Sequence, residues 1–439
     1  MGLVTRAAVI FRERLLVGLS WNILSAVATQ GSVLISAIIV ARILGLQSFG
    51  GYALLVSTVM TVAAVAQVGN GLAATKFVGE ALSLDSARVA RILALCRAVA
   101  LVTGGVATLA VIGAADLLCG RVLGRPEMSP SMRLIAVATL FQILSIYQVG
   151  ALQGFGAFKE MSRSGAVAGV AHVACTGIGA WTGELPGAVI GYVVASLVRA
   201  AAMGHALRTV RAENRIPATA TPDPLDTRLI WRFAVPAGLA GLVTMPCLWA
   251  VSVLVARLPN GLELVAVFTV GHQLRLAVLQ MPSLLNGVSF SVMSRMKGAD
   301  DRQGFRGVFW SNLAANAVVA SVVVALSVVL VDPLLRLYGP DFLFGRQLLI
   351  LLLLSVLPEM LAMSFYQLIQ SEGRMWQSLF AIALPRDLLY LALASALLPA
   401  FGITGAAGAY LLAHTVGACL TVGIARHKAP ASLWKLRQP

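Results

Sequence analysis

The chain has 439 residues, of which 59% are hydrophobic and only 12% are charged. Soluble domains carry about 25% charged residues, so this composition, with a mean hydropathy of +0.87, excludes an ordinary soluble protein. The formal net charge of +15 would also suit a nucleic-acid-binding protein. The basic residues, however, lie mostly in connections between apolar segments, where they set membrane orientation, so we expect no nucleic-acid partner.

Twelve apolar segments follow a short basic N-terminus that extends to Arg14. Most are close to the roughly 20 residues that an α-helix needs to cross a bilayer, whereas barrel strands have about 10 residues of alternating polarity. The first segment is too long for the core of a cleaved signal peptide. The sequence therefore predicts an all-α integral membrane protein with about twelve transmembrane helices. The expected spans are residues 17–41, 51–75, 92–118, 132–156, 164–182, 187–207, 233–256, 264–293, 307–331, 346–370, 377–399 and 403–425.

Loop charge predicts the orientation of these spans. The segments on the side of the N-terminus carry 22 Lys and Arg residues, and the opposite loops with their edges carry 7. Cytoplasmic loops are enriched in Lys and Arg, so both termini are expected in the cytoplasm.

The two halves of the chain resemble each other across a polar connector, which has prolines and alternating charges but no apolar periodicity. Each half has six spans, so both halves have the same orientation, and a pseudo-two-fold axis along the membrane normal is expected, with the ligand site between the halves. The expected parts are an N-terminal six-helix lobe (1–207), a cytoplasmic linker (208–232), a C-terminal six-helix lobe (233–425) and a basic cytoplasmic tail (426–439).

The evidence for duplication is a set of matching residues whose separation changes slowly along the chain. Short insertions and deletions after a duplication leave such a drift, whereas chance matches would scatter. The matching pairs are Arg42 and Arg257, Asp116 and Asp332, Gln153 and Gln370, and Tyr192 and Tyr410, with separations of 215, 216, 217 and 218 residues.

Arg275 is the most informative polar residue, because it lies near the middle of the eighth span with His272 one turn before it. An arginine at a membrane centre costs about 2.5–3.5 kcal/mol on insertion scales, so it faces protein or a watery cavity. We expect Arg275 and His272 to contact an anionic ligand; the alternative is an ion pair that holds helices together. Arg199 is a further candidate of the same kind, whereas Arg97 lies close enough to the cytoplasmic end to extend to the surface.

Glu359, Arg386 and Asp387 form a second polar group in the tenth and eleventh spans. We expect these three residues to be neighbours, either as a structural ion pair or as a relay for a proton or sodium ion. Pro358 and Pro385 precede them and could bend both helices. The mid-membrane arginines outnumber the acids, which favours an anionic ligand.

Amide side chains can bind sugars because they donate and accept hydrogen bonds without carrying charge. Arg42 and Arg257 lie at the outer ends of the first and seventh spans, as interfacial anchors or as contacts of an outer gate. Any one amide in a membrane span is more often a helix–helix contact. The amides that could line a sugar path are Asn22, Gln30, Gln67, Asn70, Gln273, Gln280 and Asn286.

The sequence predicts no catalytic or metal site. Its five cysteines are scattered without a metal-ligand or redox spacing, and no triad or phosphate-binding glycine loop is present. We expect no cofactor.

The stretch from Asn22 to Leu82 resembles the opening of bacterial polysaccharide transporters, the O-antigen and exopolysaccharide flippases of the multidrug/oligosaccharidyl-lipid/polysaccharide exporter superfamily. The resemblance lies in an Asn-headed first span, then ARILG and FGGYAL, then a second span with a Gly-rich turn and Lys76. It implies two lobes around a central cavity and alternating-access transport of undecaprenyl-pyrophosphate-linked oligosaccharide to the periplasmic leaflet. It also implies a monomer of the bacterial inner membrane, in contact with membrane lipids, and leaves open whether a glycan polymerase is a partner.

Two other functions remain as alternatives. A cation-coupled multidrug exporter would have the same fold, but exporters of organic cations need a mid-membrane carboxylate, which the first half lacks. A membrane glycan polymerase or ligase has similar hydropathy but usually a large periplasmic loop, whereas the longest outward connectors here, 119–131 and 332–345, are short.

Overall fold

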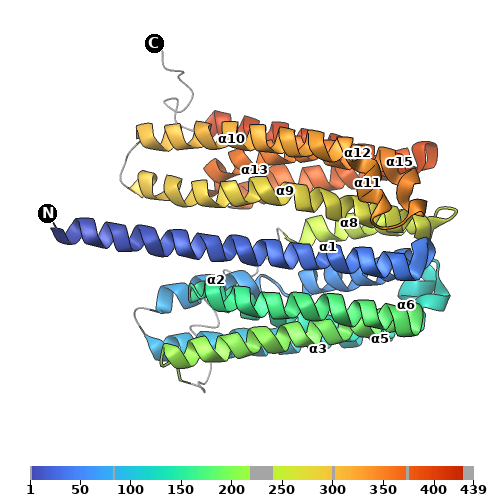
Figure 1. The fold of residues 1–439 in the computed structure, drawn as a ribbon, viewed down its shortest axis with the longest axis horizontal. Coiled ribbons are helices and arrows are strands. Elements are labelled where there is room, and N and C mark those ends of the chain that lie inside the picture. The colour runs from blue at the N-terminus through green and yellow to red at the C-terminus, as the bar shows by residue number, and fades with distance from the viewer. Residues whose placement is uncertain (1, 83–84, 218–240, 299–301, 372–374, 429–439) are drawn as a thin grey trace, which may run out of the picture. The chain divides into compact units, whose positions relative to one another are not determined.

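The computed structural model describes residues 2–82, 85–217, 241–298, 302–371 and 375–428. It describes the side chains in these ranges from Gln30 onward, except those of 241–242, 287–288, 290–292, 294–298, 302, 370–371, 375 and 428. This part of the chain is almost entirely helical, and it contains no β-strand (Figure 1). The chain divides into two compact units, residues 1–242 and 243–439. The linker expected from the sequence ends at residue 232, so the boundary between the two units lies ten residues after it.

The first unit is built from four long helices. α1 (Gly2–Ala66) and α5 (Ser129–Gly154) both pack on α6 (Phe158–Glu213), and α3 (Ser86–Gly113) packs on α5. α2 (Asn70–Ala81) lies between α3 and α5. Short elements connect α3 to α5: α4 (Ala115–Leu117), a π-helix (Leu118–Val122) and a 3-10 helix (Pro126–Met128).

The second unit repeats this pattern. α9 (Gly261–Gly298) packs on α10 (Arg302–Val329), and α13 (Val356–Ser371) contacts α9, α10 and α15 (Leu384–Lys428). The remaining elements are α8 (Gly241–Ala256), α11 (Val331–Arg336), a 3-10 helix (Pro340–Gly345), α12 (Arg346–Leu354), α14 (Met375–Ser378) and a π-helix (Leu379–Ala383).

Three of the long helices each contain a break. α1 leaves helical geometry at Gly45, α6 at Gly183 and Glu184, and α15 at Gly402. Eight described stretches are long and apolar enough to cross a membrane, and Val243–Ala256 is a shorter apolar helix. Because α1, α6 and α15 each supply two arms, the described helices account for the twelve expected spans.

Glycines let the two arms of α6 pack with their backbones in close contact. A Cβ atom at Gly179 would overlap the carbonyl oxygen of Gly187, and one at Gly191 would overlap that of Cys175. Small residues at such positions are typical of helix packing in membranes, because lipid gives helices no hydrophobic reason to associate.

The structure differs from the expected spans at three places. The second span is interrupted at 67–69, where Val68 and Gly69 have positive φ angles, and the tenth is divided at Ser355 between α12 and α13. α6 continues to Glu213, so residues 208–213 of the expected linker are helical. Residues 218–240 and the tail 429–439 lie outside the described residues.

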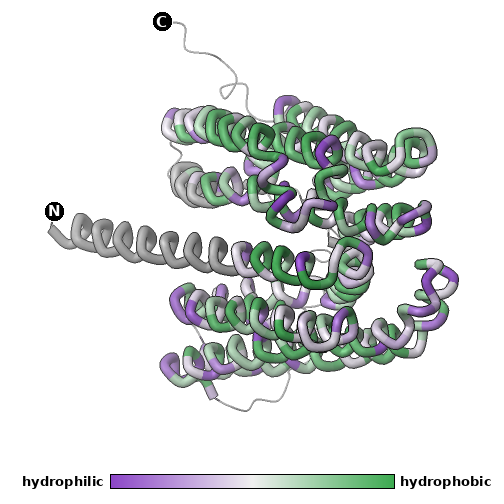
Figure 2. The backbone as a smooth tube through the Cα atoms, turned by 45° about the vertical axis from the view of Figure 1, so that its right-hand side comes forward, coloured by the Kyte–Doolittle hydropathy of each residue, from purple (hydrophilic) through white to green (hydrophobic). Residues whose placement is uncertain are grey.

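The helices expose apolar side chains along their lengths, as a lipid environment requires. On α10, Val318, Val322 and Leu326 form one stripe and are 65%, 60% and 56% exposed. Figure 2 shows hydrophobic residues along the helices and hydrophilic residues mostly toward their ends and connections. The composition, the helix lengths and this surface agree that the protein crosses the membrane several times.

Candidate functional site

Arg275 and Glu359 form a buried ion pair inside the second unit. The guanidinium Nη1 of Arg275, in α9, donates to the Oε2 atom of Glu359, in α13. Arg275 is 3% exposed, and its guanidinium carbon lies 4.7 Å from the centre of the Tyr410 ring on α15. Burying two charges is costly, so their stability depends on close pairing and on further polar contacts. Arg275 meets this requirement in part: it pairs with one acid and lies over one aromatic face.

Tyr410 is the centre of a group of rings around this ion pair. His414 stacks on it at a centroid distance of 3.8 Å, and Tyr390 and His272 meet it edge to face at 5.2 and 5.0 Å. His272 also packs edge to face on Phe268 at 4.6 Å. The expected proximity of His272 to Arg275 is therefore present, and the imidazole contacts aromatic rings on both sides.

Arg386 and Asp387 form a second, separate pair. Arg386 donates from Nε to Oδ1 of Asp387 at 2.7 Å and from Nη2 to Oδ2 at 3.0 Å. The hydroxyl of Thr244, in α8, donates to the same Oδ2 at 2.6 Å. Asp387 thus accepts three hydrogen bonds and fastens α15 to α8. Glu359 pairs with Arg275 rather than with these two residues.

Several buried polar atoms near the ion pair have no hydrogen-bond partner among the described residues. They are His272 Nε2, Gln273 Oε1, Arg275 Nε and the Tyr390 hydroxyl. Buried polar groups are rarely left without a partner, so such atoms mark places where water or a ligand binds.

The first unit has a counterpart of this cluster in which an amide, Gln142, takes the place of the acid. Gln142 in α5 donates from Nε2 to the hydroxyl oxygen of Tyr192 at 3.0 Å and to Ser196 at 3.3 Å. Tyr192 meets Tyr52 and His172 edge to face, at 6.3 and 5.8 Å. The separation of 217 residues that relates Gln153 to Gln370 also relates Gln142 to Glu359.

Arg199 differs from Arg275 and Arg386 because none of the acids in the described residues lies beside it. It lies in α6, half buried, and its electrostatic neighbours are Tyr192 and His172. Within the described part of the chain, Arg199 makes neither an ion pair nor a hydrogen bond. Arg97, the fourth mid-span arginine, is exposed.

The other candidate residues are dispersed. Asn70 is buried and donates to the Cys96 carbonyl at 2.8 Å, so it joins α2 to α3. Gln30 and Gln67 are half buried, and Asn22 lies where side chains are not described. Arg42 and Arg257 are exposed near the Gly45 break and at the end of α8, respectively.

Sequence reasoning missed a buried amide network in the second unit. Asn286 Oδ1 accepts hydrogen bonds from Asn312 Nδ2 at 2.8 Å, Asn316 Nδ2 at 3.2 Å and the Ser364 hydroxyl at 3.3 Å. Gln367 donates to the backbone oxygen of Asn286 at 3.0 Å. The i, i+4 spacing of Asn312 and Asn316 on an apolar helix was the available signal. Asn286 is one of the amides for which the sequence leaves open a sugar contact or a helix–helix contact, and in the structure it links α9, α10 and α13.

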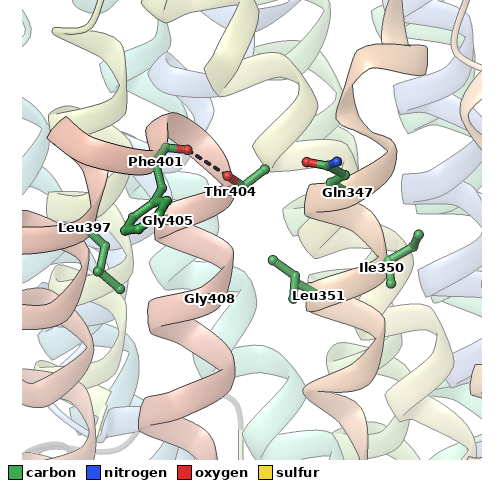
Figure 3. A pocket seen from close by; sticks show the side chains of 8 residues that line it. All are labelled: Gln347, Ile350, Leu351, Leu397, Phe401, Thr404, Gly405 and Gly408. Carbon is green, nitrogen blue, oxygen red and sulfur yellow. Dashed lines mark hydrogen bonds between the residues drawn. The ribbon is translucent and has the colours of Figure 1, made fainter.

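A groove of about 460 Å³ lies between α12 and the arms of α15 (Figure 3). Its walls are mostly apolar. It is lined by Gln347, Ile350, Leu351, Leu397, Phe401, Thr404, Gly405 and Gly408.

Residues 15–297 match the sequence model of a family described as polysaccharide biosynthesis protein. No curated protein sequence matches the chain. Among solved structures, an inward-facing multidrug resistance MATE family transporter of the MOP superfamily is similar, with a TM-score of 0.82, 16% identity and coverage of 93% of this chain and 96% of that one. A MOP superfamily transporter from Pyrococcus furiosus, titled as having a binding pocket of reverse polarity, gives a TM-score of 0.71 and 15% identity, with coverage of 95% of each chain. At these identities, the likeness shows the fold: an all-α membrane protein of two six-helix lobes.

Proposed function

Because this membrane transporter belongs to the polysaccharide biosynthesis protein family, we propose that it flips an undecaprenyl-pyrophosphate-linked oligosaccharide from the cytoplasmic to the periplasmic leaflet. The proposal places the protein in a bacterial inner membrane, with both termini in the cytoplasm, where the loop charge predicts them. It treats the protein as a monomer that needs no cofactor. A glycan polymerase would act on the product after transport.

The observation that carries the proposal is the unpaired charge of Arg199. Arg275 and Arg386 are each neutralised by an acid in the second unit, whereas Arg199 has no acid beside it in the described residues. An isolated cation at membrane depth is costly unless a partner neutralises it. A pyrophosphate or an acidic sugar supplies that negative charge, and an arginine can bind it through two parallel hydrogen bonds.

Arg275 would provide an anion contact within the second unit, where the substrate anion would replace Glu359 as its partner. If the substrate anion drew Arg275 away, Glu359 would be left as a buried carboxylate without its partner, and it would then take up a proton or a sodium ion. Asp387 is less suited to this exchange, because its two oxygens already accept three hydrogen bonds. In this proposal, Arg386 and Asp387 hold α15 to α8 while Glu359 provides the coupling.

The amide residues would contact the sugars. We assign this role to Asn22, Gln30, Gln67, Asn70 and Gln273, and an outer-gate role to Arg42 and Arg257. Gln273 is the best supported of the amides, because its Oε1 atom is buried without a partner in the described structure. Asn70 is the least supported, since its amide already donates to Cys96.

A multidrug exporter is the second candidate function, and the named MATE transporters of similar fold favour it. Export of an organic cation requires an acid that is free to bind it. Glu359 and Asp387 both pair with arginines in the second unit, so their arrangement favours an anionic substrate.

The test is complementation of a bacterium that lacks its own O-unit flippase. The wild type, Arg199→Gln, Arg199→Lys and Arg97→Gln would be expressed, and surface glycan and lipid-linked intermediate would be measured. We expect the wild type and Arg97→Gln to restore glycan, Arg199→Gln to leave the intermediate in the inner leaflet, and Arg199→Lys to retain part of the activity. Equal transport by Arg199→Gln and the wild type would contradict the role of Arg199. A wild type that changes drug resistance but moves none of several glycans would favour the exporter.

A further inference from the structure

The groove between α12 and α15 has a polar end and an apolar floor. Figure 3 shows Gln347 and Thr404 toward one end, and Ile350, Leu351 and Gly408 farther along. The Thr404 hydroxyl already donates to the carbonyl oxygen of Phe401 at 2.7 Å. The floor therefore offers a ligand hydrocarbon surface, and polar groups are available at one end.

The polar end of the groove coincides with helix ends. Gln347 is the second residue of α12, and Thr404 follows the Gly402 break in α15 by two residues. Arg346, the first residue of α12, has a side chain that is 61% exposed and lies 3.4 Å from Asp332. A guanidinium has five N–H donors, so Arg346 can bind a phosphate and still contact Asp332.

Water is a poor occupant of this groove. Its walls are mostly apolar, and apolar protein surface offers water few hydrogen-bond partners. The two walls belong to membrane-spanning helices, so the surrounding medium is lipid. A hydrocarbon chain with a phosphate at its head matches the apolar floor, the polar end and Arg346, which precedes the lining residue Gln347.

We propose that this groove binds one acyl chain of a membrane phospholipid, with the lipid phosphate at Arg346. A bilayer phospholipid is preferred to a lipid-linked oligosaccharide because occupancy follows concentration, and phospholipid is the bulk component. By the charge asymmetry of the loops, this end of the helices faces away from the cytoplasm, so the lipid belongs to the outer leaflet. The bound chain fills the space between α12 and α15 and stabilises their packing.

Gly408 provides a direct test. A Cβ atom built at Gly408 meets no atom within 4 Å, and Gly408 lines the groove, so a larger side chain there begins in open space and takes up groove volume. Gly423, on the same helix but outside the groove, also has no atom within 4 Å and serves as the matched control. The wild type, Gly408→Leu and Gly423→Leu would be purified in mild detergent, and bound lipid would be identified by native mass spectrometry.

We expect the wild type and Gly423→Leu to retain one phospholipid per chain, and Gly408→Leu to lose it. As a measurement that needs no variant, a phospholipid with a photoreactive acyl chain should cross-link the wild type within 347–351 and 397–408. Equal retention by Gly408→Leu, or cross-links confined to other helices, would overturn the proposal. Retention of a lipid-linked oligosaccharide in place of phospholipid would overturn the choice of occupant.

Discussion

Gln142 and Glu359 are equivalent residues of the two halves, yet one has neutral partners and the other pairs with a buried cation. Gln142 donates to Tyr192 and Ser196, whereas Glu359 accepts from Arg275. The equivalent tyrosine, Tyr410, lies against Arg275 rather than against an amide. The equivalent position is therefore a neutral amide in the N-terminal lobe and a titratable acid in the C-terminal lobe.

The first prediction concerns Glu359→Gln, which removes the countercharge of Arg275. Arg275 would then be a buried cation without its acid, and breaking such a pair costs about 3–5 kcal/mol. We expect a large fall in the thermal unfolding temperature of the purified protein in detergent, read by tryptophan fluorescence. Gln142→Ala is the control in the other lobe; it removes neutral hydrogen bonds worth about 1 kcal/mol each, so its effect should be smaller.

A double variant separates charge from packing in this experiment. Arg275→Met together with Glu359→Gln removes both charges while keeping most of the side-chain volume, so it should recover much of the lost stability. The same variant should remain inactive in the complementation assay if Arg275 contacts substrate. Full recovery of transport by the double variant would show that the pair serves stability alone.

The second prediction ranks the groups that hold α8 to α15. Asp387→Asn weakens two charge-assisted hydrogen bonds from Arg386, whereas Thr244→Val removes one hydroxyl donor. Hydrogen bonds to charged groups contribute about 1.5–3 kcal/mol each, and the Thr244 hydroxyl also donates to the charged carboxylate, so the number of bonds that each variant affects decides the ranking. We expect Asp387→Asn to lower the unfolding temperature more than Thr244→Val does. A greater loss from Thr244→Val would contradict the assignment of Asp387 as the centre of this contact.

Hydropathy was sufficient to predict the fold class but not the breaks in the helices. The apolar runs of the spans are long. Gly45 and Gly402 divide α1 and α15 into two arms each, where two spans were expected. The expected second span, 51–75, runs through the interruption at 67–69, although the resemblance to polysaccharide transporters includes a Gly-rich turn in that span. What decides that break is the positive φ of Val68 and Gly69, which hydropathy does not record.

The sequence could not predict which charged residues pair with each other, for a different reason. Arg275 and Glu359 are 84 residues apart on different helices, and an apolar run does not fix how a helix is rotated about its axis. A single sequence therefore shows which residues are charged at membrane depth but leaves their partners open. Arg386 and Asp387 are adjacent in the chain, which made their contact easier to predict.

The third prediction addresses the amide network around Asn286. Asn316 donates to Asn286 Oδ1 and also to Asn312, and Asn286 Oδ1 accepts from three donors. Removing Asn286 leaves buried donors without an acceptor, at about 1–3 kcal/mol for each such group. In a double-mutant cycle with Asn286→Ala and Asn316→Ala, we expect the double variant to lose less stability than the sum of the single losses. Strict additivity of the unfolding free energies would mean that the two amides do not interact.

The fourth prediction tests the close approach of α2 and α5. A Cβ atom at Gly150 would overlap the carbonyl oxygen of Gly71, and Thr75 donates to the Gly150 carbonyl at 2.9 Å. Gly150→Ala must therefore push the two helices apart, and overpacking of this kind costs about 1–3 kcal/mol. Gly105→Ala, in α3, is the control, because a Cβ atom there meets nothing within 4 Å and alanine favours helix over glycine by about 1 kcal/mol. We expect opposite shifts in unfolding temperature, downward for Gly150→Ala and upward or none for Gly105→Ala. An unchanged temperature for Gly150→Ala would mean that α2 and α5 can separate at no cost, and that the glycine contact does not set their spacing.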